Sequence, residues 1–134
     1  MTYVVAYIAT AIVFLGLDAL WIGKVALGLY RQDMGGQLLD KPNLAVAGLF
    51  YLFYIAGIVI LAISPALAEG NWLKALLFGA VLGFVAYGTY DFTNLSTLRN
   101  WPLSLSLVDV AWGTALTAVT ALGGYWAVRW LLPG

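Results

Sequence analysis

Residues 72–95 read WLKALLFGAVLGFVAYGTYDFTNL, an almost uninterrupted apolar run that ends in a cluster of polar side chains. About 20 mostly apolar residues in a helix cross the hydrocarbon core of a bilayer, and this run has that length. Asn71 stands directly before it as a candidate N-cap. We therefore expect a membrane-spanning helix that places a carboxylate, Asp91, close to its C-terminal end.

The composition of the whole chain agrees with a membrane location. Of the 134 residues, 63% are hydrophobic and only 9% are charged. Soluble domains carry about 25% charged residues, so this chain lacks the polar side chains that would cover a water-exposed surface. The sequence predicts an all-α integral membrane protein, and its length fits a single membrane domain over residues 1–134.

Three further windows have the length and apolarity of membrane spans. They cover about residues 2–22, 44–63 and 103–132. The motif KPN precedes the second of them and the motif SP closes it, as turn-forming residues do at helix ends. No basic region precedes the first window, which favours a retained span over a cleavable signal peptide. We expect a four-transmembrane-helix bundle with both termini on one side.

The connection between the first and second helices is longer than the other two. Four large apolar residues recur in it at spacings of three and four, opposed by polar residues: Leu27, Tyr30, Met34 and Leu38. This pattern predicts a short interfacial amphipathic segment, with a solvated loop as the alternative.

Several kinds of chemistry are excluded by the residues that the chain lacks. It has no Cys and no His, so disulfides, thiol chemistry, haem ligation by His and zinc sites of Cys and His are ruled out. Its net charge is zero and it has no basic cluster, which argues against a nucleic-acid partner. No D-x-D or DDxxD spacing supports a metal site, and we expect no metal and no cofactor.

Three acidic residues fall inside the predicted spans: Asp18, Asp91 and Asp109. Counted along the helices, each lies about 6–9 Å from a helix end, and all three of these ends face the same side of the membrane. An ionisable side chain inside a span is costly, so each of the three is a candidate functional residue. Their common depth predicts that they meet in one pocket.

Aromatic and amide side chains share this depth and complete the predicted pocket. The candidate ligand-binding or proton-linked residues are Asp18, Trp21, Tyr51, Tyr54, Tyr87, Tyr90, Asp91, Asn94, Asp109 and Trp112. The alternative is that these polar groups only join helices by hydrogen bonds, with Lys24 or Arg99 neutralising an acid. No residue in the set is assigned a catalytic role by the pattern.

Small residues form stripes that lead into the acids. Gly79 and Gly83, within GAVLG, form a GxxxG motif four residues before Tyr87, and Gly113 and Gly124 follow Asp109. Such residues let helices approach closely in lipid. We expect these four glycines to pack helices together and the acids to point into the bundle.

Two short motifs indicate a shared site. DALWIG (18–23) and DVAWG (109–113) each place Trp three residues after Asp, on the same helix face, with Gly close behind. Together with YGTYDFTNLSTLRNWP (87–102), they resemble an uncharacterised family of small four-span bacterial inner-membrane proteins. The resemblance covers essentially the whole chain and implies a polytopic membrane protein of the bacterial inner membrane. It implies no activity and no catalytic residue.

Four basic residues, Lys24, Arg31, Lys41 and Arg99, lie on the side opposite the termini, and two, Lys74 and Arg129, lie on the side of the termini. By the positive-inside rule this places both termini in the periplasm.

Three classes of function fit these features. The favoured one is binding or transport of a small amphipathic or lipid-like molecule, with a possible link to protons. Transport would require a homodimer, because one small protomer is too thin to enclose a pathway. The alternatives are an intramembrane lipid- or isoprenoid-modifying enzyme using paired Asp, and a non-catalytic accessory subunit.

Overall fold

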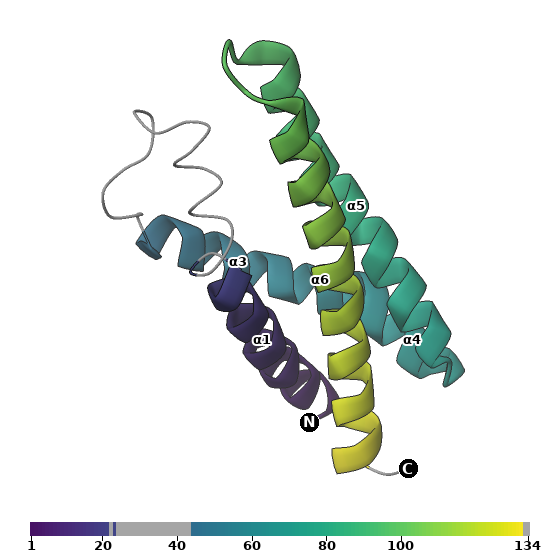
Figure 1. Ribbon diagram of the computed structural model, residues 1–134. Coiled ribbons are helices and arrows are strands. Elements are labelled where there is room, and N and C mark those ends of the chain that lie inside the picture. The colour runs from purple at the N-terminus through teal and green to yellow at the C-terminus, as the bar shows by residue number, and fades with distance from the viewer. Residues whose placement is uncertain (22, 24–43, 133–134) are drawn as a thin grey trace.

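The computed structural model describes residues 1–21, 23 and 44–132, and within these residues every regular element is a helix. The elements are α1 (Thr2–Trp21), α3 (Leu44–Ile58), the π-helical turn η3 (Val59–Ile63), α4 (Ser64–Glu69), α5 (Trp72–Thr97) and α6 (Leu103–Leu131). Because α3, η3 and α4 follow one another without a break, they form one long helical segment (Figure 1).

Four helical segments are long and apolar enough to cross a membrane. They are Thr2–Trp21, Ala45–Glu69, Trp72–Thr97 and Leu103–Leu131. The start of α1 and the end of α6 lie at the same end of the bundle (Figure 1). The expectation of an all-α bundle of four transmembrane helices is confirmed.

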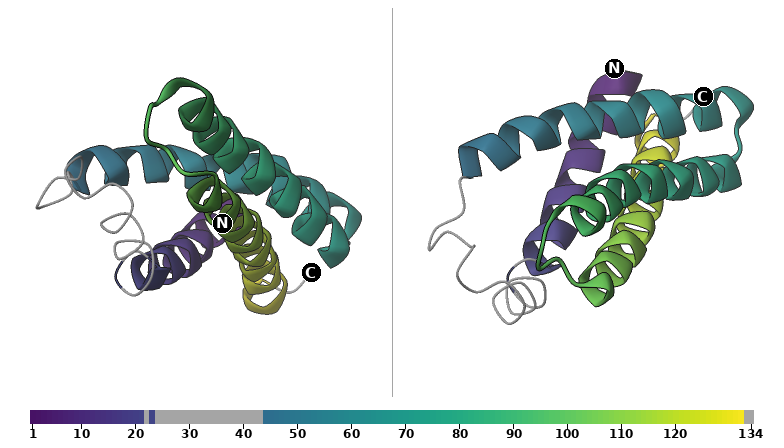
Figure 2. Two further views of the ribbon diagram at one scale, coloured as in Figure 1. Left: turned by 45° about the horizontal axis from the view of Figure 1, so that its top comes forward. Right: turned by 90° about the horizontal axis from the view of Figure 1, so that it is seen from above.

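Helix α6 is the central helix. It makes its most extensive contacts with α5, next to α1, and it also touches η3. More than half of its most apolar window (56%) is buried inside the protein, against 17–28% for the other three spans. Figures 1 and 2 show α5 and α6 as a long antiparallel pair; α1 packs against α6, and the α3–α4 segment contacts both helices of the pair.

The turn between α4 and α5 is set by two residues. Gly70 adopts φ 61°, the left-handed conformation that ends many helices, and its N–H reaches the carbonyls of the last turn of α4. The Asn71 side chain then accepts a hydrogen bond from the Leu73 N–H at 3.1 Å. Asn71 is therefore the N-cap of α5, as the sequence predicts.

The second span is longer than its sequence indicates. The motif SP marks an end near Ile63, but the helical path continues to Glu69. Pro65 lies at the first positions of α4, where its missing N–H costs little, and the preceding turn is π-helical. The wider turn accommodates a proline that would break an ordinary α-helix in its interior.

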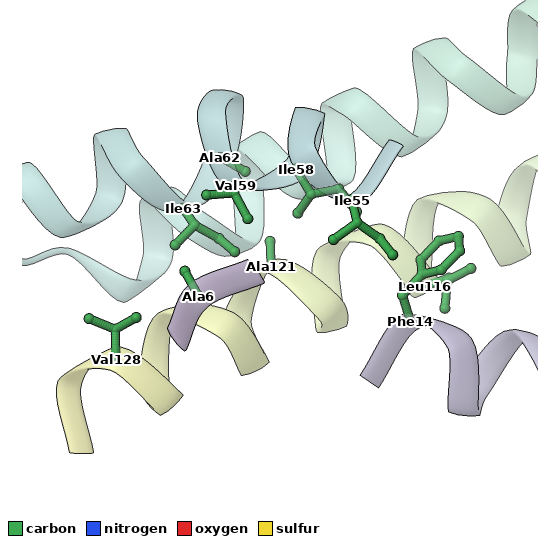
Figure 3. Close-up of a cluster of buried hydrophobic side chains, with 10 residues drawn as sticks. All are labelled: Ala6, Phe14, Ile55, Ile58, Val59, Ala62, Ile63, Leu116, Ala121 and Val128. Atoms are coloured by element: carbon green, nitrogen blue, oxygen red, sulfur yellow. The ribbon is translucent and has the colours of Figure 1, made fainter. Parts of the chain in front are cut away.

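Apolar side chains form both the interior and the outer surface. The main buried cluster joins α1, the α3–η3 segment and α6 (Figure 3); its members are Ala6, Phe14, Ile55, Ile58, Val59, Ala62, Ile63, Leu116, Ala121 and Val128. The outer faces expose large apolar residues on every span, among them Ile12, Phe53, Val81 and Leu107. A surface of this kind is stable against lipid and not against water.

Glycines allow the close approach of α6 to its neighbours. A Cβ on Gly79 would stand 2.8 Å from the Thr117 carbonyl oxygen, and a Cβ on Gly83 would meet the Gly113 carbonyl oxygen. A Cβ on Gly113 would run into the Tyr87 ring, and one on Gly124 would meet Thr10 of α1. These four glycines therefore lie at helix contacts that have no room for a larger residue.

Two hydrogen bonds tie α1 to the second span. The Tyr7 hydroxyl donates to the Leu52 carbonyl at 3.0 Å, and the hydroxyls of Tyr3 and Ser64 are 3.2 Å apart. The predicted interfacial segment between the first two helices lies outside the described residues.

Candidate functional site

A cavity of about 430 Å³ lies among the four spans. Eight of its lining side chains are aromatic and two are acidic: the full lining is Phe14, Asp18, Trp21, Phe50, Tyr51, Tyr54, Ala86, Tyr87, Tyr90, Asp109 and Trp112. Phe50 and Tyr90 are more than half exposed, so the cavity communicates with the outside along their side of the bundle. Its volume falls within the range of small-molecule sites.

The two Asp-x-x-Trp motifs meet at this cavity. The indole rings of Trp21 and Trp112 are stacked, with centroids 4.6 Å apart and planes inclined by 7°. One ring comes from α1 and the other from α6, so the stack joins helices that are far apart in sequence. The similarity of DALWIG and DVAWG therefore corresponds to a physical contact between the two motifs.

Asp18 stands in the wall of the cavity with an incomplete set of hydrogen bonds. It is only 5% exposed, and it interacts with the Tyr51 hydroxyl and lies beside Trp112. Within the described part of the chain, Asp18 Oδ2 and Trp112 Nε1 each lack a hydrogen-bond partner of good geometry. Buried polar atoms are usually paired, so Asp18 Oδ2 can accept a contact from a ligand in the cavity.

The tyrosines are held in position by neighbouring helices. The hydroxyls of Tyr54 and Thr117 are 2.8 Å apart, which fixes the Tyr54 side chain against α6. The Tyr87 ring packs on Gly113, and its centroid lies 6.4 Å from that of Tyr54 in an edge-to-face arrangement. Phe14 supports this wall from α1, with centroids 5.5 Å from the Tyr54 ring. The aromatic wall is thus built by packing between helices rather than by one helix alone.

Asp91 and Asp109 form a pair behind the wall. Their carboxyl groups interact with each other without a hydrogen bond of good geometry, and Asp109 also interacts electrostatically with Asp18. Asp109 lines the cavity, whereas Asp91 is fully buried and does not. Among the described residues no donor reaches either carboxyl oxygen of Asp91.

Two of the ten predicted pocket residues, Asp91 and Asn94, are not in the cavity wall. Consecutive residues of an α-helix are about 100° apart, so Asp91 points past the cavity toward the first turns of α6, while Tyr87 and Tyr90 face the cavity. There the Ser106 hydroxyl donates to the Asp91 backbone carbonyl at 3.1 Å. Asp91 and Asn94 thus lie outside the cavity wall, and the other eight predicted residues line it.

Some residues that shape the site carry no clear signal in the sequence. Phe50 and Ala86 line the cavity, and nothing in their local pattern distinguishes them from lipid-facing neighbours. Trp101 is buried and donates to the Ser106 hydroxyl at 2.8 Å. Ser106 lies three residues before Asp109, and that spacing on a helix face is the one sequence feature that links it to the site.

The acids of the site have no basic partner in the described part of the chain. The one ion pair found there joins Lys74 to Glu69, 2.8 Å apart, at the turn between α4 and α5. Arg99 is exposed in the connection between α5 and α6 and pairs with none of the three acids. Lys24, the other basic residue considered as a partner, lies outside the described residues.

No set of three or more acidic side chains in the described residues is arranged to hold a metal ion. The site offers two carboxyl groups, four phenol hydroxyls and the indole N–H of Trp112 around an aromatic cavity. This arrangement can bind a molecule that has both an apolar part and a polar or charged group.

The helices and their exposed apolar faces define the class: this is a multi-pass α-helical membrane protein. The chain belongs to the family described as "Predicted membrane protein (DUF2177)", whose model matches residues 3–126. The function of that family is unknown, and the resemblance to an uncharacterised membrane-protein family is confirmed.

No curated protein and no solved structure matches the chain.

Proposed function

We propose that this protein binds a small amphipathic or lipid-like molecule in the cavity between its four spans and moves that molecule within or across the membrane. The observation that supports this most directly is the combination of an aromatic cavity of about 430 Å³ with a buried acid whose Oδ2 has no partner among the described residues. A purely structural polar contact between helices would be expected to pair its atoms. Unpaired atoms that face a cavity are typical of a binding site.

The walls fit a ligand with an apolar part. Phe14, Phe50 and the ring faces of the tyrosines contribute most of the lining, and the exposed rim at Phe50 and Tyr90 gives access from the outside. Since the outer faces of these helices are apolar, a molecule dissolved in the bilayer can reach the rim directly. The acids then orient the polar end of the molecule.

Movement of a ligand across the membrane would require two copies of the chain. The cavity lies among the aromatic and acidic residues, whereas the segment around Ala6, Ile63 and Ala121 is closely packed. A homodimer in the bacterial inner membrane, with both termini in the periplasm, provides a second set of helices around the ligand. The excess of Lys and Arg on the side opposite the termini supports this orientation.

The orientation has a clean test, because the chain contains no Cys. Single variants Thr2→Cys and Arg99→Cys are exposed in intact cells to a thiol reagent that does not cross the inner membrane. Labelling at position 2 with protection at position 99 supports the orientation, and the reverse pattern contradicts it.

Binding is tested by filling the cavity. Ala86 lines the cavity, so Ala86→Phe occupies space that the ligand needs. Ala80 is on the same helix but lies in a groove on the outer α5–α6 face, so Ala80→Phe is the matched control. The probe is 1-octanol, titrated against purified protein in a neutral detergent, with tryptophan fluorescence as the signal.

We expect saturable binding in the wild type and in Ala80→Phe, and at least tenfold weaker binding in Ala86→Phe. Melting temperatures confirm that both variants are folded, and Ala86→Leu replaces Ala86→Phe if the larger residue prevents folding. Equal titrations for all proteins would mean that octanol partitions only into the detergent, and the proposed site would be rejected.

A second candidate function is an intramembrane enzyme that modifies a lipid or an isoprenoid. The contact between Asp91 and Asp109 favours it, because two neighbouring carboxyl groups can divide the roles of acid and base. Purified protein incubated with a bacterial lipid extract, without any gradient, would then form a product visible by mass spectrometry. The product would be absent for Asp109→Asn; no product in either case rejects this candidate.

A further inference from the structure

We infer that the molecule bound in this cavity is an organic cation, with its positive group held between Asp18 and Asp109 and enclosed by aromatic rings. This inference rests on the proposed function and specifies the chemistry of its ligand. It follows from three features of the cavity: its acidic side chains, the aromatic rings around it, and a buried carboxyl oxygen that has no hydrogen-bond partner among the described residues.

The charge of the lining has one sign. Asp18 and Asp109 both line the cavity and come from different helices. They are close enough that their negative charges would repel each other. Asp91 adds a third carboxyl group directly behind Asp109. No basic side chain in the described ranges pairs with any of them. The cavity therefore presents acidic groups and no counter-charge from the part of the chain that the structure describes.

A carboxylate placed in a bilayer without a counter-charge is costly. A cation that enters the cavity removes much of this cost, because it pairs with Asp18 and Asp109 at once. A neutral ligand offers only hydrogen bonds, and an anionic ligand adds repulsion. Binding of a cation therefore stabilises the ionised form of these two acids, which a neutral or an anionic ligand does not do.

The rings favour an organic cation over a metal ion. Trp21 and Trp112 stack at one side of the cavity, and Tyr51, Tyr54 and Tyr87 stand around the rest. The faces of aromatic rings attract ammonium groups, and cages of this kind recognise quaternary ammonium ligands. A small metal ion needs several oxygen ligands at short distance, and the described residues offer no such cluster.

The unpartnered atoms show where the polar group would lie. Asp18 Oδ2 lacks a partner among the described residues although its residue is 95% buried, and it lies in the cavity wall next to the Trp112 indole. An ammonium group there would contact Asp18 and the ring of Trp112 together. The apolar part of the ligand would then extend along Phe14 toward the open rim at Phe50.

The test compares three probes that share an eight-carbon chain and differ in charge: octyltrimethylammonium, 1-octanol and octanoate. Each is titrated against the full chain in neutral detergent by tryptophan fluorescence. We expect octyltrimethylammonium to bind at least tenfold more tightly than 1-octanol, and octanoate to bind more weakly than both. Similar affinities for the cation and the alcohol would overturn the assignment of charge.

Variants locate the cation. Asp18→Asn and Asp109→Asn preserve the size of each side chain and remove its charge, so each should weaken octyltrimethylammonium at least tenfold and change 1-octanol less than twofold. Glu69→Gln removes an exposed acid at the distant turn between α4 and α5 and should change neither. An equal loss for both probes in the Asp variants would indicate a general structural effect and reject the inference.

The outcomes separate this inference from the proposed function. If 1-octanol binds and Ala86→Phe blocks it, but the cation shows no advantage, the ligand site stands and its cationic specificity is rejected. If no probe binds saturably to the wild type, both the site and the inference fail.

Discussion

The two halves of this bundle use the same helices in different ways. In the half that contains Ala6, Ile63 and Ala121, small and branched apolar residues fill the interior, and a Cβ added at Gly79 or Gly124 would meet neighbouring atoms within 3 Å. In the half that contains Asp18 and Asp109, large aromatic residues hold the helices apart around a cavity. We name these the packed half and the open half.

The difference shows how side-chain size distributes stability and function along a membrane helix. Helix association in lipid depends on close packing and on hydrogen bonds between helices, because lipid tails solvate apolar surface as well as Leu does. The packed half provides this association, so the open half can keep a cavity. The two halves should therefore respond in opposite ways to the removal of a side chain.

The largest change in the free energy of unfolding is expected for a substitution in the packed half. Ile63→Ala removes a fully buried side chain of the main cluster and leaves a cavity, which should lower the free energy of unfolding by about 2–5 kcal/mol. Ile60→Ala is the control in the same π-helical turn, since Ile60 is 63% exposed and faces lipid. Unfolding in mixed micelles measures both; equal losses would show that Ile63 is not a core residue.

In the open half, the removal of buried polar groups should stabilise the protein instead of destabilising it. The double variant Asp18→Leu/Tyr51→Phe replaces a buried carboxyl and its hydroxyl partner with apolar groups, and should raise the free energy of unfolding by about 1–3 kcal/mol without ligand. Cation binding should be lost in the same protein. A decrease in stability would show that Asp18 serves mainly to hold the helices together.

The smallest change in the free energy of unfolding is expected when the hydrogen bond between Tyr54 and α6 is removed. Tyr54→Phe removes the contact with the Thr117 hydroxyl and should lower the free energy of unfolding by about 0.6 kcal/mol, the average for such bonds in membrane bundles. A double-mutant cycle with Thr117→Val isolates the pair. A coupling energy near zero would mean that packing alone positions Tyr54.

Much of the fold can be predicted from the sequence because its signals are local. The four apolar windows give the spans, and Asn71 marks the start of α5. The end that Ser64-Pro65 predicts for the second span is wrong, because the effect of the proline depends on the π-helical turn before it. That turn has no clear sequence signature.

The candidate site is predictable in part for a related reason. The common depth of the acids follows from counting residues along helices, and eight of the ten predicted residues line the cavity. The direction of Asp91 does not follow, because it depends on how α5 is rotated against α6. The stack of Trp21 on Trp112 and the empty space beside it also depend on how separate helices pack.

The central position of α6 has a consequence for biosynthesis. Chains are made and inserted from the N-terminus, so α6, the span with the largest share of buried residues, leaves the ribosome after the other three described spans. Until it arrives, α1 lacks its largest contact surface and Asp18 faces the bilayer without Asp109 or Trp112 nearby. Assembly of these four spans therefore waits for α6, and a chain that stops before residue 103 would lack the helix that carries most of the contacts between spans.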